Sequence, residues 1–371
     1  MSRKPRILFI ATFPPPIHGS SVVSEQIRNS KVIYDTFEGD YVNLGTSRRM
    51  DEIGKGGLWL NLKKLLRFAG SFIRTLCLLL THRYDLCYCA ITCHGAGFLK
   101  DAPFVLLCKL FGRKIVIHQH NKGMSRDVNR PVYRWLLPMV YRNVKVILLS
   151  WHLYPDIEKV VKQEDVMICP NGIKPTVDPN FVRTPNEVPH ILFLSNLLID
   201  KGVLVLLDAL RLLKDRGYSF VCDFVGSETK DIDAARFAKE VEARSLNRLA
   251  VYRGRKYGAD KNVFWKNTDI FVFPTFYSNE TFGLVNLEAM EYSLPVISTN
   301  EGGIPDVVIN GETGYTVEKN NPEVLADAIE LLFKNPKLRI QMGQAGRKRF
   351  EALFTEVTFE QRMKECLGMS I

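Results

Sequence analysis

The sequence has few of the features that mark secreted, membrane-spanning or nucleic-acid-binding proteins. The apolar run at residues 7–10 is too short for a signal peptide and predicts a first β-strand instead. The most apolar long segment, residues 58–81, is interrupted by Arg67 and Arg74, which argues against a transmembrane helix. No segment resembles a DNA- or RNA-binding motif, so nucleic acid is not an expected partner.

Cysteine is also sparse, with eight residues spread over a chain of 371. Cys87, Cys89 and Cys93 form the one close group, within a strand-like run, and no second group completes a four-ligand zinc site. We therefore expect reduced thiols in the core of a cytosolic protein.

The positive charge is concentrated in the amino-terminal half. Residues 1–189 carry 27 Lys and Arg against 15 Asp and Glu, whereas the remainder carries 23 against 25. A basic surface on one part of a protein suggests an acidic substrate, an anionic lipid surface or nucleic acid. Because nucleic-acid motifs are lacking, the first two remain as expected partners.

Apolar strand-like runs alternate with helical patterns along the chain, which predicts parallel sheets covered by helices. The expected strands are residues 6–11, 40–42, 86–91, 114–118, 145–149, 190–194, 218–225, 249–252, 270–273, 295–298 and 314–317. Residues 174–189 contain four prolines and little apolar periodicity, which is typical of a linker. Two Rossmann-like α/β domains of similar size are expected, one on each side of it.

Residues 58–81 form the most amphipathic segment of the chain. On a helical wheel the polar sector holds Asn61, Lys63, Lys64, Arg67, Ser71, Arg74 and Thr75, and the apolar sector holds Leu62, Leu65, Leu66, Phe68, Phe72, Ile73 and Leu76. We expect the apolar sector to pack on the sheet and the basic sector to face water. The alternative is that this helix and its surplus charge hold the basic domain on an anionic bilayer surface.

Two glutamates, Glu280 and Glu288, follow the expected strand at residues 270–273. Glu280 lies in a segment with the Pro, Asn, Ser and Gly of a loop, and Glu288 lies in the helical pattern after Gly283. The helical rise separates the two acids by about 12 Å, with helix-start amides between them. This arrangement suits a ligand with hydroxyls at both ends and an anion in the middle. A helix-start charge and an ordinary surface charge are the simpler alternative.

Three further turns have residues suited to anion binding. Gly19, with two hydroxyl residues after it, ends the loop at residues 12–21 and begins a helical pattern. Lys201 stands just before a helix, where a cation is unfavourable unless an anion is near. Gly302 and Gly303 precede a helix that starts with proline.

His118 and His120 lie at the carboxyl end of the expected strand at residues 114–118. Strand alternation puts both side chains on one face, so one of them can be structural. Two histidines without further ligands do not make a metal site.

The order of these motifs resembles that of retaining glycosyltransferases of the GT-B fold, family 4 (glycosyl transferases group 1). The shared features are the glycine loop, the strand-end histidine, Pro170-Asn171-Gly172, Lys201-Gly202, the two glutamates, and Gly302-Gly303-Ile304-Pro305. The resemblance implies two Rossmann-like parallel-sheet domains facing across a cleft. Residues 1–173 would bind the acceptor, 174–189 would be the linker, 190–354 would bind the nucleotide sugar, and 355–371 would be a helix crossing back to the first domain.

The same resemblance implies roles for individual residues. Glu280 would bind the hydroxyls of the donor sugar, Glu288 would bind the ribose, and His120, which fits the family position better than His118, would orient the sugar. Lys201 and the helix-start amides would hold the diphosphate as it leaves. The expected catalytic residues are Glu280 and His120, and the expected donor-binding residues are Gly19, Asn196, Lys201, Phe282, Gly283, Leu284 and Glu288.

The chain departs from the family at Asn196, where an arginine is usual. One positive charge expected near the diphosphate is therefore missing. Either the amide suffices, or another basic residue compensates for it; the nearby candidates are Arg253, Arg255 and Lys256.

The function implied is retaining, metal-independent transfer from a UDP- or GDP-sugar to a saccharide acceptor. No cofactor is expected beyond this nucleotide-sugar substrate. A lipid-linked acceptor in bacterial surface polysaccharide biosynthesis, and a cytoplasmic location with peripheral membrane contact, would suit the basic first domain. Asp231 and Asp233 form the Asp-x-Asp pattern of metal-dependent transferases, but they open a predicted helix. The remaining alternatives are a GT-B nucleotide-sugar epimerase and a non-catalytic nucleotide-sugar-binding protein.

Overall fold

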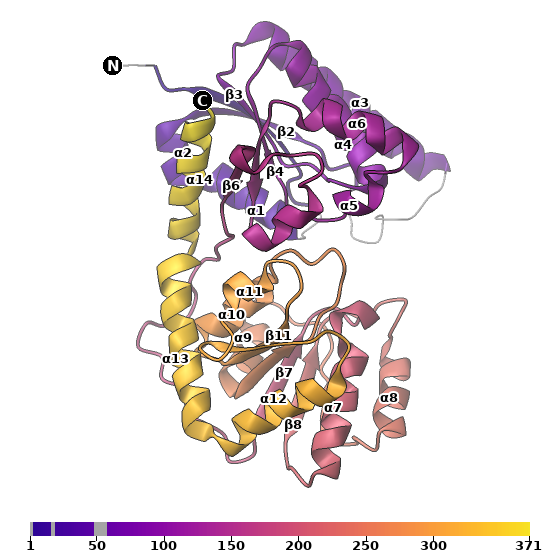
Figure 1. Cartoon of the computed structure of the whole chain (residues 1–371), viewed down its shortest axis with the longest axis vertical. Helices are drawn as coiled ribbons and strands as arrows, with labels where there is room; N and C mark the ends of the chain where they lie inside the picture. The colour runs from indigo at the N-terminus through magenta and orange to yellow at the C-terminus, as the bar shows by residue number, and fades with distance from the viewer. Residues whose placement is uncertain (1–2, 16–18, 48–57) are drawn as a thin grey trace. The chain divides into compact units, whose positions relative to one another are not determined.

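The computed structural model describes residues 3–15, 19–47 and 58–371, so residues 16–18 of the predicted glycine loop lie outside it. The chain divides into two compact units, Met1–Asn171 with Glu356–Ile371, and Gly172–Thr355. Each unit contains a six-stranded parallel sheet covered by helices (Figure 1), which confirms the predicted α/β fold class.

The sheet of the first unit has the order β2-β1-β3-β4-β5-β6. Its strands are β1 (Arg6–Ala11), β2 (Glu38–Asn43), β3 (Leu86–Cys89), β4 (Ile115–His118), β5 (Lys145–Leu148) and β6 (Val166–Ile168). β1, β3 and β4 are covered on both faces, which is why they appear in the sequence as continuous apolar runs. The short edge strand β6 was not predicted, because three residues carry too little pattern.

Helices cover both sides of this sheet. They are α1 (Gly19–Asn29), α2 (Lys31–Thr36), α3 (Leu58–Thr81), α4 (Gly95–Leu110), α5 (Met124–Asp127), α6 (Pro131–Tyr141) and α14 (Glu356–Ser370), with the 3-10 turns η2 (Trp151–Asp156) and η3 (Gln163–Asp165). α4 contacts both α3 and α6, so these three form one layer, whereas α14 packs on α2 and on β3 and β4 (Figure 1).

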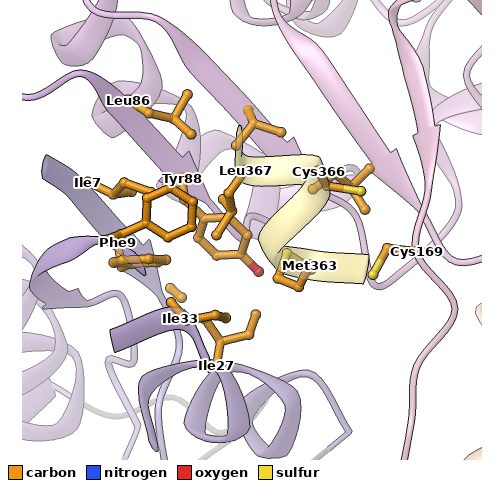
Figure 2. Packing of buried hydrophobic residues seen from close by; sticks show 14 of the residues in the cluster. Ile7, Phe9, Ile27, Ile33, Leu86, Tyr88, Cys169, Met363, Cys366 and Leu367 are labelled. Atoms are coloured by element: carbon orange, nitrogen blue, oxygen red, sulfur yellow. The ribbon is translucent and has the colours of Figure 1, made fainter. Parts of the chain in front are cut away.

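The C-terminal helix α14 completes the core of the first unit (Figure 2). Met363 and Leu367 of α14 are fully buried against the cluster that contains Phe9 and Tyr88. The rings of Phe9 and Tyr88 lie 5.4 Å apart. The last helix therefore supplies part of the hydrophobic core of the unit in which the chain begins.

The orientation predicted for α3 is only partly right: Phe68 and Phe72 pack inward and Lys63 and Arg74 are exposed, as expected, but other residues do not lie as expected. The side chain of Arg67 donates a hydrogen bond to the carbonyl of Thr46, Ser71 donates to the carbonyl of Asn43, and Thr75 is fully buried, so part of the polar sector faces the protein. Residues of the apolar sector such as Leu66 are exposed instead. In the part of the chain that the structure describes, no helix combines the length and apolar content needed to cross a bilayer.

The sheet of the second unit has the order β12-β11-β10-β7-β8-β9. Its strands are β7 (His190–Leu194), β8 (Val221–Val225), β9 (Ala250–Tyr252), β10 (Ile270–Phe273), β11 (Val296–Thr299) and β12 (Gly314–Val317). Its helices are η4 (Ile199–Lys201), α7 (Val203–Asp215), α8 (Ala234–Ala243), α9 (Gly258–Asn267), α10 (Leu284–Glu291), α11 (Ile304–Val307), α12 (Pro322–Lys334) and α13 (Pro336–Leu353).

The chain winds outward in both directions from the central pair β7 and β10. From β7 it proceeds to β8 and β9 on one side, and from β10 to β11 and β12 on the other. The loops that leave the carboxyl ends of β7 and β10 therefore diverge over opposite halves of the sheet. Open α/β sheets bind ligands at such a reversal of strand order.

The proline-rich segment at residues 174–189 belongs to the second unit and is tied to it by Arg183. The Arg183 guanidinium donates hydrogen bonds to the backbone carbonyls of Trp265, at 2.9 Å, and of Tyr292, at 2.8 Å. Burial lowers the pKa of Arg183 to about 10, so the side chain remains protonated and able to donate at neutral pH.

Glu291, at the end of α10, holds the start of the same segment. Its buried carboxylate accepts hydrogen bonds from the backbone N–H groups of Thr176 and Val177, the latter at 2.7 Å. Two backbone donors that no helix or strand satisfies are thereby paired with a charged acceptor.

Replacement of Glu291 by alanine should lower the free energy of unfolding of the second unit by about 3 kcal/mol, because two backbone N–H groups lose their charged, buried acceptor. Urea titration measures this through the fluorescence of Trp265, which is buried in the second unit, after Trp59, Trp135 and Trp151 are replaced by Phe.

The matched control is Glu351→Ala on α13, since Glu351 is exposed and pairs with Arg347 within one helix. That change should stay within about 0.5 kcal/mol. Equal effects of the two substitutions would contradict the role of Glu291.

Candidate functional site

The loop between β10 and α10 carries Glu280 and ends at Gly283. Gly283 has φ of 66°, a left-handed conformation that favours glycine, and it precedes the first residue of α10. The turn after β11 packs against this loop: a Cβ atom on Gly302 would lie 2.4 Å from the Glu280 carbonyl oxygen. The N–H of Gly303 donates to the carbonyl of Thr281 at 2.8 Å. The turn after β11 therefore holds the backbone around Glu280.

The segment after β7 brings Lys201 to the same loop. Gly202, with φ of 85°, approaches Pro274 so closely that a Cβ atom would lie 2.2 Å from the Pro274 carbonyl oxygen. The N–H of Phe276 donates to the carbonyl of Asp200 at 2.8 Å. Lys201 is thus held by backbone contacts and not only by its side chain.

Lys201 and Glu280 form an ion pair at the reversal of strand order. Lys201 Nζ lies 2.6 Å from Glu280 Oε2, and their side chains are 15% and 11% exposed. The ammonium also lies 4.5 Å from the ring centroid of Tyr277. The second carboxylate oxygen, Oε1, accepts from the Gly283 N–H at 3.2 Å. The sequence singled out both charged residues but not their contact, and no sequence signal indicated Tyr277.

Glu288 lies on α10 and pairs with a lysine that the sequence analysis missed. Lys261 Nζ of α9 is 2.7 Å from Glu288 Oε2, and both side chains are about one quarter exposed, at 27% and 28%. This pair is more accessible than that of Lys201 and Glu280. A partly exposed pair of this kind is weak in water, so a ligand hydroxyl can replace one of its contacts at small cost.

The start of α10 contains a buried amide. Asn286 is fully buried, and neither its Oδ1 nor its Nδ2 has a hydrogen-bond partner among the described residues. Phe282, also buried, packs its ring against that of Phe354 at 5.9 Å. Leu284 and Val285, the first two residues of α10, remain partly exposed, and the N–H groups at the start of a helix have no acceptor within it.

Asn196 lies just past the carboxyl end of β7, at the position where the family resemblance predicted an arginine. Its Oδ1 accepts from the N–H of Ser227 at 3.3 Å, so the amide joins the loops after β7 and β8. Of the basic residues considered as replacements, Arg253 pairs with Asp223 at 2.8 Å, and the Arg255 guanidinium lies 4.3 Å from the Tyr257 ring centroid.

The two histidines of the first unit have different environments. His118 is fully buried, its Nδ1 lies 2.7 Å from the Tyr88 hydroxyl, and its ring centroid is 4.0 Å from that of His120. Burial, and next the neighbouring His120, hold the pKa of His118 well below its usual value, which keeps this imidazole neutral. His120 is partly exposed.

His120 lines a polar cavity of about 260 Å³ within the first unit. The cavity also borders Ser20, Thr92, Lys100 and Asn121. Gly19 is the first residue of α1, next to Ser20, and a Cβ atom on it would meet no described atom within 4 Å. Packing against other described groups therefore does not require glycine at this position.

The Asp-x-Asp sequence serves a helix start, as expected. Asp233 is the N-cap of α8, and its carboxylate accepts from the Arg236 N–H at 2.7 Å.

The segment that holds these charged pairs matches a known family. Residues 177–349 match the family described as Glycosyl transferases group 1. The capsular polysaccharide biosynthesis glycosyltransferase CapM of Staphylococcus aureus is 34% identical over 165 residues, which are 44% of this chain and 41% of CapM. The aligned region thus spans less than half the length of that relative.

Solved structures match over nearly the whole chain. Sucrose-phosphate synthase from Thermosynechococcus elongatus superimposes with a TM-score of 0.76 at 19% identity, covering 99% of both chains. HepE of Anabaena, solved in complex with UDP, gives a TM-score of 0.75 at 17% identity, covering 98% of this chain and all of HepE. The chain therefore has the GT-B fold, and its second unit carries a domain of the glycosyl transferases group 1 family.

Proposed function

We propose that the protein is a retaining glycosyltransferase that moves a sugar from a UDP- or GDP-sugar to a saccharide acceptor. The observation that carries this proposal is the largely buried contact of Lys201 with Glu280, beside the start of α10, within the family-matched segment. It combines a cation, a carboxylate and helix-start amides at the reversal of strand order.

Lys201 and α10 would hold the diphosphate of the donor. Among the described residues, Glu280 accepts the one hydrogen bond that the Lys201 ammonium makes, and an ammonium has three donors. The Gly283 N–H is already bonded to Glu280. The N–H groups of Leu284 and Val285 would therefore donate hydrogen bonds to the phosphate oxygens. These groups would stabilise the negative charge that develops on the leaving diphosphate.

The two glutamates would bind the two hydroxyl-rich ends of the donor. Glu280, oriented by Lys201 and Gly283, would accept hydrogen bonds from the sugar hydroxyls. Glu288 would accept from the ribose hydroxyls, with Lys261 releasing part of its contact. Hydrogen bonds to a charged acceptor are stronger than those between neutral groups.

The first unit would bind the acceptor. Its polar cavity offers hydroxyl, amide, imidazole and ammonium groups, which suit a saccharide, and His120 at its border would orient the donor sugar. The name of the relative CapM supports a role in surface polysaccharide synthesis, where the acceptor would be lipid-linked. In the proposed reaction the leaving phosphate oxygen accepts the proton of the attacking hydroxyl, on the same face of the sugar, and no metal takes part.

UDP or GDP should raise the melting temperature of the native protein, because a ligand that binds only the folded state stabilises it. Replacement of Lys201 by methionine should abolish this rise. The double variant Lys201→Met/Glu280→Gln should be more stable than the single variant, since Glu280 is then no longer an unpaired buried charge, yet should still show no rise. A thermal-shift panel of UDP, GDP and ADP measures this, and a full nucleotide response in the double variant would contradict the role of Lys201.

The substitution Glu288→Gln should weaken UDP binding by at least about tenfold and leave pyrophosphate binding unchanged, because only the ribose contacts are affected. Isothermal titration calorimetry with both ligands measures the difference. The control is Asp327→Asn on α12, because Asp327 is exposed and pairs with Arg216. This substitution should change neither affinity. Equal losses for both ligands would assign Glu288 to the phosphate or to local structure.

The first product formed should have the anomeric configuration of the donor sugar. Proton NMR of the anomeric signal soon after mixing distinguishes it from the inverted product. The reaction should proceed equally in the presence of EDTA. An inverted product would exclude same-face attack, and loss of transfer in EDTA that Mg²⁺ restores would exclude the metal-free mechanism.

A further inference from the structure

The outer side of α3 is an apolar stripe that no described segment covers. Leu62, Leu66 and Ile73 recur at helical spacing, and they are 45%, 63% and 59% exposed. The opposite side of the helix packs inward through Phe68 and Phe72, whose rings contact that of Phe104 on α4. The exposure of the stripe is therefore not caused by fraying, because the helix packs on α4.

A second apolar stripe lies on α6. Val132, Trp135 and Met139 are 58%, 78% and 54% exposed and follow the spacing i, i+3, i+7. With Pro131 and Leu136 they line a shallow depression. An exposed tryptophan in the middle of such a stripe is uncommon for a surface that remains in water.

The two stripes belong to one layer of the first unit. α4 contacts α3 on one side and α6 on the other, and all three connect strands that follow each other in one direction across the sheet (Figure 1). We call Leu62, Leu66 and Ile73 of α3 with Val132, Trp135 and Met139 of α6 the α3–α6 surface.

The charged side chains that α3 and α6 themselves carry are all cations. Neither α3 nor α6 contains an aspartate or glutamate. Lys63 and Arg74 of α3 are exposed, as is Arg134 of α6. The one acidic residue of α4, Asp101, is buried and pairs with Lys100 at 2.8 Å. An apolar surface flanked by these exposed cations complements a bilayer with an anionic surface.

We propose that the α3–α6 surface docks the first unit on an anionic lipid bilayer. The two helices lie along the membrane, their apolar stripes enter the boundary between headgroups and acyl chains, and Lys63, Arg74 and Arg134 contact lipid phosphates. Trp135 occupies the interfacial region that amphipathic aromatic rings favour. This docking does not depend on the proposed transfer reaction.

The stripe on α3 revises the basis for membrane contact. Arg67 belongs to the basic sector predicted from the sequence, but its guanidinium is bonded to the Thr46 carbonyl, so it supports the fold of the unit. The leucines and isoleucine that were expected in the core are the groups that a bilayer would cover.

Vesicle flotation of the full-length protein tests the proposal. Binding to vesicles of phosphatidylglycerol should exceed binding to phosphatidylcholine. The variant Lys63→Gln/Arg74→Gln/Arg134→Gln should lower the partition coefficient about 100-fold in total, because each cation near an anionic surface contributes about fivefold. High salt should weaken the wild type to a comparable extent.

The apolar groups are tested separately by Leu66→Gln/Ile73→Gln/Trp135→Gln/Met139→Gln. This variant should lose binding by at least about 100-fold even at low salt. All four side chains are more than half exposed, so the fold should persist. The matched control replaces Tyr34 and Met369, which are 73% and 69% exposed on α2 and α14, by glutamine and should bind as the wild type does.

Depth is measured with Trp135 as the one exposed tryptophan, after Trp59 and Trp151 are replaced by Phe. Brominated lipids should quench its fluorescence, and Trp265 is too deeply buried to respond. Unchanged binding of either multiple variant, or failure of brominated lipids to quench Trp135, would overturn the proposal. Self-association that the apolar variant abolishes, with no vesicle binding by the wild type, would assign the surface to a second copy of the chain.

Discussion

The contact between Lys201 and Glu280 connects the two loops that form the candidate site of the second unit. It joins segments that are 79 residues apart and that leave the two central strands of the sheet. The close backbone approach at Gly202 holds these two segments together, and the approach at Gly302 supports the loop that carries Glu280. A largely buried ion pair adds little net stability because both groups lose water, but its geometry is well defined. The carboxylate and the ammonium are therefore oriented before a ligand arrives.

The parts of the fold that follow from local pattern were predictable from the sequence. Strands such as β1, β4 and β10 are covered on both faces, and each gives a continuous apolar run that few other structures explain. The start of α10 was predictable from Gly283, whose left-handed backbone disfavours other residues. The charged residues of the site followed from their places at strand ends. The short edge strand β6 had no comparable signal.

Contacts between distant segments were not predictable in the same way. Nothing in the sequence pairs Lys201 with Glu280 or Lys261 with Glu288, because such contacts depend on how loops pack over the sheet. The side of α3 that faces the protein was predicted only in part, for a related reason. A helical wheel shows that a helix has two unlike sides, but it does not show which side the rest of the protein covers. In the structure, Arg67 and Ser71 of the polar side are hydrogen-bonded to backbone carbonyls of the protein.

The distribution of cysteines gives the chain a single natural position for chemical labelling. Seven of the eight thiols are buried, and Cys77 on α3 is the exposed one. Burial, or a contact with another thiol, raises the pKa of Cys87, Cys93 and Cys222, which suppresses the reactive thiolate. A thiol-reactive fluorophore or spin label should therefore attach mainly to α3 in the unmodified sequence. The protein thus already contains a site-specific reporter on the helix whose surroundings most need to be observed.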